Sequence, residues 1–245
     1  IQYLDTSSEI DGATVFNENT FDEAAFSTNP QSTDDVIYSS VQNAVDDSQT
    51  GATVTVDTGT YGENVTVGVE GLSIEGPNAG TAGDADDRGD EATINGQVVV
   101  SVDGVVFDGF DVTPPNATDN SNAEALRVSG AADDVTVRNN IVREFGEDGI
   151  SQWEGVDGIN LFGGSADDAV SNVSVTSNLV EGVSGRSTDG GTAGISVQGN
   201  IENAEISDNT VRNIGEEETA WAFGVTVRGT EIDNVEETPT ERPAP

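Results

Sequence analysis

Apolar and polar residues alternate in short runs that recur along the chain. The run "DDVTVRNNIVREF" at Asp133–Phe145 is followed by "NVSVTSNLVEGV" and "NAEISDNTVRNI". An apolar residue at every second position predicts a β-strand rather than a helix. Aligning the runs places in equivalent positions first Ile74, Phe107, Val137, Val175 and Ile206, and later Val112, Val142, Val180 and Val211. The chain therefore repeats one structural unit about every 30–40 residues.

A second, shorter run alternates with the first and reads "ALRVSG", "GINLFG", "GISVQG" and "GVTVRG". A unit this short cannot bury its own apolar face, but stacked units share one continuous core. We therefore predict an all-β, right-handed parallel β-helix. A β-sandwich would need two-residue hairpin turns, which are scarce, and a propeller blade would need a longer repeat. In the short strands, alternation predicts two outward rows: Arg127, Asn160, Ser196 and Thr226, then Ser129, Phe162, Gln198 and Arg228.

The repeats suggest three parts of the chain. Residues 37–235 form the β-helix, residues 1–36 an irregular acidic segment, and residues 236–245 a Pro- and Glu-rich tail or linker. Within the β-helix, residues 37–49 read as an amphipathic helix that covers the open end, with Asp34 or Asp35 as its N-cap. Three asparagines recur at one corner and predict a ladder of stacked amides with left-handed backbone: Asn140, Asn178 and Asn209.

Charge changes the picture of where such a protein works. The chain has 46 acidic and 8 basic residues, a net charge of −38, and no cysteine, methionine or histidine. Acids spread over a folded body are typical of proteins from saturated salt, where repulsion is screened. The same charge argues against nucleic acid, and no apolar run is long enough to enter a membrane. We expect an extracellular or cell-surface protein of a halophilic archaeon or its virus.

One stretch resembles a known superfamily. "SVQNAVDDSQTGATVTVDTGTYGENVTV", from Ser40, is similar to the opening of pectin-lyase-like right-handed β-helix proteins, and later coils resemble their NosD-like and haloarchaeal surface-protein branch. The resemblance implies the fold and a polysaccharide or surface glycan as partner. Lyases of this superfamily use an Arg or Lys base with Ca²⁺, whereas its polygalacturonases and epimerases need histidine, which this chain lacks. "GVDGINLFGG", from Gly155, is loosely similar to a methylesterase motif, but it also repeats the ordinary short strand.

Long loops follow one another at a single corner, where binding sites usually form on a rigid scaffold. Aromatic rings and amides there would suit a glycan, and the candidate ligand-binding residues are Trp153, Trp221, Phe162, Asn160, Gln198 and Arg127. Alternatively, both tryptophans pack their loops onto the barrel. If the protein is an enzyme, the candidate catalytic residues are Arg143, Glu147, Asp148, Glu154 and Asp157.

An acidic loop and three sequons complete the candidate sites. "GDADDRGDE" is a possible Ca²⁺ loop with Asp84, Asp86, Asp87 and Asp90 as ligands, although Arg88 at the fifth position favours a solvated loop. Asn-x-Ser/Thr sequons at Asn64, Asn116 and Asn172 favour a glycosylated, secreted protein.

Three functions fit these features. The first is a non-catalytic surface module for glycan recognition, adhesion or envelope architecture. The second is a polysaccharide-active enzyme of lyase or esterase type. The third is a filament or spike subunit that associates through the C-terminal coil end, where no capping element is recognisable between Thr230 and Glu236.

Overall fold

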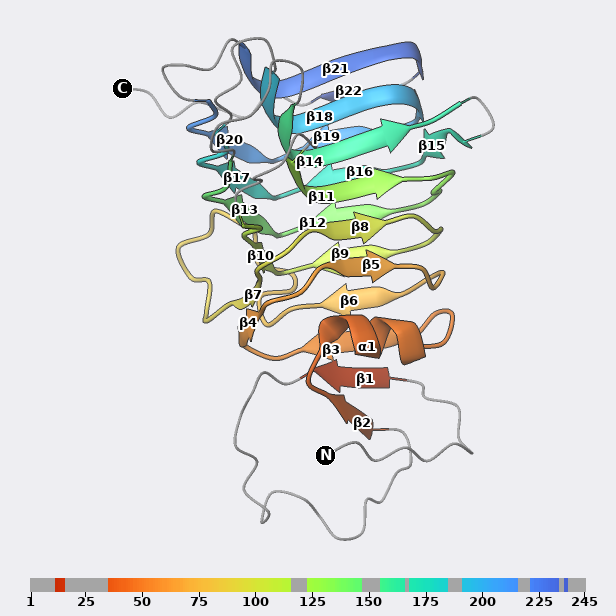
Figure 1. Cartoon of the computed structure of the whole chain (residues 1–245), viewed down its shortest axis with the longest axis vertical. Coiled ribbons are helices and arrows are strands. Elements are labelled where there is room, and N and C mark those ends of the chain that lie inside the picture. The colour runs from red at the N-terminus through yellow and green to blue at the C-terminus, as the bar shows by residue number, and fades with distance from the viewer. Residues whose placement is uncertain are drawn as a thin grey trace, which may run out of the picture.

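The computed structural model describes residues 12–15, 35–115, 123–146, 155–165, 168–184, 191–215, 221–233 and 236–237. Every strand pair in these ranges is parallel, and the strands form three sheets that run the length of a rod (Figure 1). The predicted parallel β-helix is confirmed. No helix in the described residues is long and apolar enough to cross a membrane.

The nine strands of the first sheet, sheet A, are in spatial order β2 (Asp35–Tyr38), β1 (Gly12–Val15), β3 (Thr53–Val56), β6 (Ser73–Glu75), β9 (Val106–Asp108), β12 (Thr136–Arg138), β16 (Ser174–Thr176), β19 (Glu205–Ser207) and β22 (Glu236–Glu237). Sheet B contains β4 (Gly59–Tyr61), β7 (Ala92–Ile94), β10 (Asp111–Val112), β13 (Ile141–Arg143), β17 (Leu179–Glu181) and β20 (Thr210–Arg212). Sheet C contains β5 (Val65–Val67), β8 (Val98–Val100), β11 (Ala123–Ser129), β14 (Val156–Gly163), β15 (Val170–Ser171), β18 (Gly191–Glu202) and β21 (Trp221–Asp233). Each coil thus adds one strand to each sheet, beginning with β3, β4 and β5, and β15 is an additional strand of sheet C.

The register of the strands agrees with the sequence alignment. Val137 pairs with Phe107 on one side and Val175 on the other, and Val142 pairs with Val112 and Val180. All six of these side chains are fully buried. The alternation of the runs therefore builds the core directly, because a slip of one residue would turn each apolar set to the solvent.

The asparagine ladder forms at the corner between sheets A and B. The side-chain Nδ2 of Asn140 donates to Asn178 Oδ1 at 3.1 Å, and that of Asn178 donates to Asn209 Oδ1 at 2.9 Å. Each amide also donates to a backbone carbonyl of the preceding coil: Phe107, Val137 and Val175. The expectation of left-handed backbone at the ladder residues is wrong by one position. The residues with positive φ precede the ladder: Gly109, Asn139, Ser177 and Asp208.

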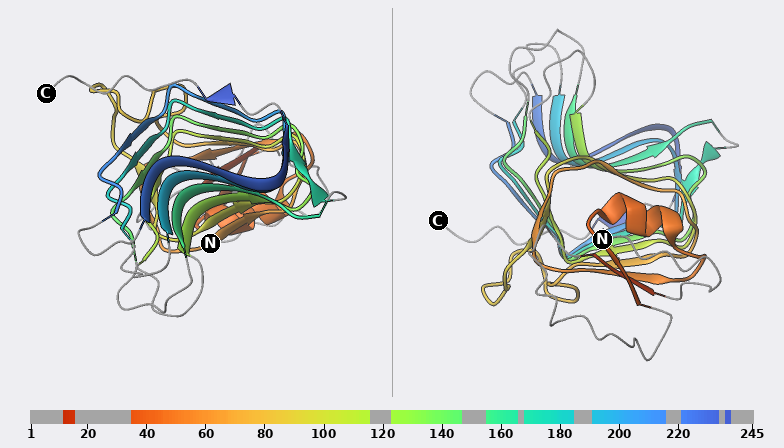
Figure 2. Two further views of the ribbon diagram at one scale, coloured as in Figure 1. Left: turned by 90° about the horizontal axis from the view of Figure 1, so that it is seen from above. Right: turned by 60° about the horizontal axis from the view of Figure 1, so that its bottom comes forward.

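The helix α1 (Val41–Asp47) lies across the N-terminal opening of the rod, as Figure 2 shows. Its N-cap is Ser40 rather than Asp34 or Asp35, because β2 occupies Asp35–Tyr38. Glu63 accepts from the backbone N–H groups of Val41 and Gln42, so a carboxylate from the first coil satisfies the helix start.

The helix also closes the exposed edge of sheet C. The Gln42 side chain donates to the carbonyl of Thr66 at 3.0 Å and accepts from its N–H at 2.6 Å. One glutamine amide thus replaces the neighbouring strand that β5 lacks. At the other end of the rod, β21 is the last strand of sheet C, and Trp221 and Val227 are exposed on it.

Candidate functional site

The outer face of sheet C carries the polar rows expected from the short strands. Arg127 pairs in register with Asn160, Asn160 with Ser196, and Ser196 with Thr226. The next outward row runs Ser129, Phe162, Gln198 and Arg228. One further row lies towards the start of the strands, where Glu124 pairs with Asp157. We refer to this surface of β11, β14, β18 and β21 as the sheet C face.

Glu124 is held by donor side chains from three successive coils. Its carboxylate accepts from Arg127 Nη1 at 3.1 and 3.2 Å and from Asn160 Nδ2 at 2.6 Å. Gln97 Nε2 approaches from the adjacent coil at 3.3 Å. The side chain is 3% exposed. Charge-assisted bonds of this kind are stronger than those between neutral groups.

Asp157 lies beside Glu124 on the neighbouring strand, but its carboxyl group has different hydrogen-bond partners and a raised pKa. Its carboxylate accepts from Gln198 Nε2 at 3.1 Å, and Gln198 also donates to Ser196 Oγ at 2.7 Å. Burial raises the pKa of Asp157 to about 7, and the negative charge of Glu124 adds to the rise, while Arg228, Ser196 and Gln198 oppose it. The pair therefore offers one carboxylate fixed by an arginine and one carboxyl group that exchanges its proton near neutral pH.

The comparison with other buried acids sets Asp157 apart. The buried acidic residues in the described part of the chain are Asp108, Asp111, Glu124 and Asp157. The first three form ion pairs with Arg138, Arg143 and Arg127 respectively. Asp157 has no ion pair within the described residues. An acid that is buried without a cation costs stability, and such groups concentrate at functional sites.

Two aromatic rings lie along the same face under guanidinium groups. The Arg127 guanidinium stacks over Phe162 with its Cζ 4.5 Å from the ring centroid, and that of Arg228 lies 5.2 Å from the centroid of Phe223. Trp221, on the same strand as Phe223, is 62% exposed. Exposed rings beside amides and carboxyls are groups that can bind the apolar faces and hydroxyls of a sugar.

The structure brings together only part of the predicted sites. Asn160, Gln198, Arg127, Phe162 and Asp157 share the sheet C face, and Trp221 begins its last strand. The remaining candidates Glu147, Asp148, Trp153 and Glu154 lie outside the described residues.

Arg143 belongs to another sheet. It extends from β13 in sheet B, where it forms an ion pair with Asp111 at 2.7 Å, and so does not join Asp157. Glu124 was not among the candidates. The alignment of "EALRVSG" with "DGINLFG" could have found it, because the two acids occupy equivalent positions.

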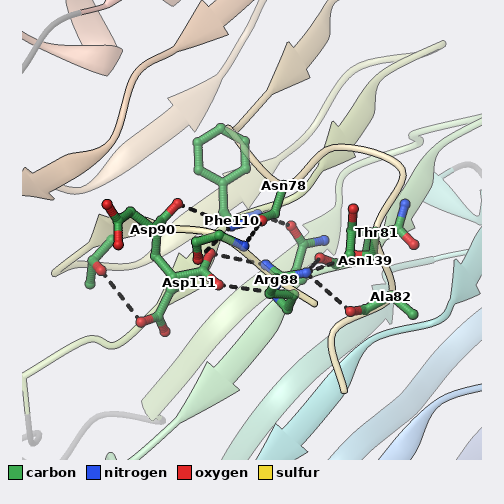
Figure 3. A network of polar contacts seen from close by, with 12 residues as sticks. Asn78, Thr81, Ala82, Arg88, Asp90, Phe110, Asp111 and Asn139 are labelled. Carbon is green, nitrogen blue, oxygen red and sulfur yellow. Dashed lines mark hydrogen bonds and ion pairs between the residues drawn. The ribbon is translucent and has the colours of Figure 1, made fainter. Parts of the chain in front are cut away.

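The acidic loop between β6 and β7 is organised around an arginine. In Figure 3, Arg88 reaches the carbonyls of Thr81, Ala82 and Asn139, at 2.7, 3.3 and 2.8 Å. It also pairs with Glu91 at 2.8 Å, and its side chain is only 6% exposed. Asn139 belongs to a later coil, so this side chain ties the loop to the corner of the rod.

The predicted Ca²⁺ ligands of this loop do not converge. No group of three or more acidic residues in the described ranges is placed to hold a metal ion, although Asp84, Asp86, Asp87 and Asp90 all lie within them. Asp84 instead accepts a hydrogen bond from Thr210, which lies on β20. The loop, residues 76–91, thus fastens several coils together rather than forming a cation site, and we refer to it as the strap.

Replacing Arg88 by methionine is expected to lower the free energy of unfolding by about 3–5 kcal/mol, because it leaves Glu91 and the carbonyls in a buried site without their donor. Urea unfolding at constant KCl measures the change. The matched control is Arg212→Met, which removes the ion pair with Glu181 but from a side chain that is 54% exposed, so at most about 1 kcal/mol should be lost. Equal decreases in the free energy of unfolding for the two variants would contradict the role of Arg88 in fastening the loop to the rod.

The sequons differ in how they are engaged. Asn64 is exposed, and its Oδ1 accepts from the N–H of Gln97 at 2.9 Å. Asn172 is also exposed, but its Nδ2, the atom that glycosylation would modify, donates to Asp133 at 2.7 Å. Asn116 lies outside the described residues. Glycosylation at the first two positions stays a prediction.

The chain was compared with known proteins. No protein-family model and no curated protein matches it. Two solved structures of pectin methylesterase from Aspergillus niger, one deglycosylated and one deglycosylated to an N-acetylglucosamine stub, align over 96% of this chain and 92% of theirs. Their TM-scores are 0.43 and 0.42 at identities of 14% and 13%. At this TM-score and identity the matches carry no conclusion about this chain, and its function has to be inferred from its own residues.

Proposed function

We propose that the protein is a polysaccharide hydrolase whose catalytic groups are Glu124 and Asp157, and that it works outside the cell at high salt. The observation that carries the proposal is the buried Asp157 carboxyl, which lacks an ion pair in the described part of the chain and has a pKa of about 7. It lies beside Glu124, which is paired with Arg127. Paired carboxyl groups with separated pKa values are the usual means of acid–base hydrolysis of glycans.

The two carboxyl groups take different roles in this proposal. Asp157, which is mostly protonated below about pH 7, donates its proton to the oxygen of the leaving group as the bond to that oxygen breaks. Glu124, ionised and oriented by Arg127 and Asn160, removes a proton from the attacking water. The water supplies the hydroxyl of one product, and the proton gained by Glu124 restores Asp157 through solvent.

This proposal favours the enzyme over the non-catalytic glycan module. A binding surface needs rings and amides, and Trp221, Phe162 and Gln198 would suffice for it. A buried acid without a cation is costly, and binding alone gives no reason to retain it. If glycans bind to the sheet C face without being cleaved, the protein is the non-catalytic binding module instead.

The test is a hydrolysis screen of the wild-type protein in multimolar KCl, where the net charge of −38 is screened. Plant, algal and microbial polysaccharides are incubated with the protein, and both new reducing ends and released ester acids or alcohols are measured. Cleavage of at least one class of polysaccharide is expected. Glycan binding without release of either product would overturn the catalytic proposal.

The pH dependence of hydrolysis provides a second prediction. Since Asp157 acts as the acid, the active form is the protonated one, and its fraction falls as pH rises through about 7. The rate at saturating polysaccharide should therefore fall about tenfold per pH unit above pH 7.5–8. A rate that is constant from pH 6 to pH 9, with the protein still folded by circular dichroism, would exclude Asp157 as the acid.

A further inference from the structure

The side-chain amide of Asn160 is hydrogen-bonded through its nitrogen, whereas its oxygen has no hydrogen-bond partner among the described residues. Asn160 is 2% exposed, and its Nδ2 donates to Glu124 Oε1 at 2.6 Å. Its Oδ1 is buried and has no hydrogen-bond partner in the described part of the structure. Buried side-chain oxygens are nearly always bonded, so this oxygen requires an explanation.

The orientation of the amide follows from its neighbour. A carboxylate can only accept, so the group that Asn160 turns towards Glu124 must be the NH₂. The unbonded atom is therefore an acceptor, and only a donor can satisfy it. Reversing the amide would place an oxygen against the carboxylate and lose the 2.6 Å bond.

The residues on either side in register make their side-chain hydrogen bonds to other groups. Arg127 Nη1 donates to Glu124, and its guanidinium stacks on Phe162. Ser196, on the other side, interacts with the Asp157 carboxyl and accepts from Gln198. Neither supplies a donor to Asn160 Oδ1.

The contrast with the asparagine ladder shows how differently the Asn160 amide is bonded. In the ladder, Asn140 and Asn178 each use both ends of the amide, on protein groups of neighbouring coils. These asparagines lie inside the rod, whereas Asn160 belongs to an outward row beside the carboxyl pair.

We propose that Asn160 Oδ1 is a specificity-determining acceptor for one hydroxyl group of the bound glycan. The inference rests on the proposed function in taking the ligand to be a glycan, but it does not require turnover. A sugar hydroxyl is a suitable donor of small size, and Phe162, 37% exposed and two residues along the same strand, provides a ring for the adjoining sugar face. Because the oxygen is enclosed, the side chains around it have to move for the hydroxyl to reach it.

The expected effect is selective for one hydroxyl. Leaving a buried acceptor without its donor discriminates strongly against ligands that lack the group. Among the monodeoxy derivatives of a bound oligosaccharide, one should bind about 10- to 100-fold more weakly than the parent. The other derivatives should bind within about threefold of it, because their missing hydroxyls meet no enclosed acceptor.

The experiment combines variants of the protein with variants of the ligand. A glycan array in 3 M KCl first identifies an oligosaccharide that binds, and calorimetry then compares it with each of its monodeoxy derivatives. In the wild-type protein one derivative should be discriminated, and in Asn160→Ala that discrimination should fall to about threefold or less. The control is Asn78→Ala, a buried asparagine of the strap that bonds Gly89 and Asp90 and should leave the discrimination unchanged.

The outcomes separate this inference from the proposed hydrolysis. Discrimination that disappears in Asn160→Ala supports it even where no polysaccharide is cleaved. Discrimination that persists in Asn160→Ala overturns it, and so does a wild-type protein that tolerates every deoxy position or binds no glycan. A crystal structure of the complex that shows a retained water on Asn160 Oδ1 in place of a sugar hydroxyl would overturn it as well.

Discussion

Asp157→Asn is expected to abolish hydrolysis and at the same time to stabilise the protein at alkaline pH. The amide keeps the shape of the side chain but cannot donate a proton at the required step, so the rate should fall about 10²- to 10⁴-fold. At pH 8 the free energy of unfolding should rise by about 1–3 kcal/mol, because the variant no longer buries an ionised carboxylate beside Glu124. If Asp157 had a purely structural role, its replacement would instead lower the free energy of unfolding of the protein.

The direction of the stability change follows from the pKa. Asp157 titrates at about 7 in the folded protein and near 3.9 in an unfolded chain. Between these values the folded state binds more protons, so the contribution of Asp157 is complete below about pH 4 and is lost as pH rises to about 7. The wild-type protein and the variant should therefore differ little at pH 4 and most above pH 7.

The measurements are initial rates and urea unfolding at pH 5 and pH 8 in the same KCl concentration. Asp111→Asn is the matched control, since Asp111 is also a buried carboxyl on the rod but is paired with Arg143 in sheet B. That variant should lose stability at both pH values and retain the rate of the folded fraction. An Asp157→Asn protein that cleaves at the wild-type rate would rule out the catalytic role.

Asn178→Ala should cost the most stability of any single side chain in the asparagine ladder, about 3–5 kcal/mol. Asn178 is the middle rung and is 1% exposed. Its oxygen accepts from the Asn140 backbone and side chain, and its nitrogen donates to Val137 and Asn209. Removing the amide leaves buried donors and acceptors on the two neighbouring coils without this partner, at about 1–3 kcal/mol each before relaxation.

The control for the ladder is Asn172→Gly, on the same coil. Asn172 is exposed and has a φ of 49°, which glycine adopts without strain. The hydrogen bond from its side-chain amide to Asp133 is solvent-accessible, so the free energy of unfolding should fall by less than about 1 kcal/mol. Unfolding in urea at constant salt measures both, and a ladder variant no less stable than this control would show that the stacked amides do not hold the coils together.

Much of the architecture follows from local pattern. The alternation in the runs around Val137 and Val175 required strands, and their spacing required that equivalent residues stack one coil above another. That inference succeeds because one face of each strand must be buried, and only one register buries it. The ladder at Asn178 was predictable for the same reason, since a repeated polar residue inside an apolar frame needs a like partner.

The candidate site was predictable only in its outward rows. Asn160, Gln198 and Phe162 were found because they alternate with core residues on a strand of known register. The grouping of Asp157 with Arg143 did not hold, because residues close in the chain lie on different sheets once the coil bends. Glu124, which is 33 residues from Asp157, became its neighbour by stacking.

The amino-acid sequence by itself determined the β-helix, its register and the acid-rich surface, because periodicity and charge are properties of the chain read in order. Only the tertiary structure decided which carboxyl groups share a low-dielectric site and which form an ion pair with an arginine. Asp157 shows the reason: its pKa depends on burial and on Glu124 from another coil, and neither is a property of its local sequence.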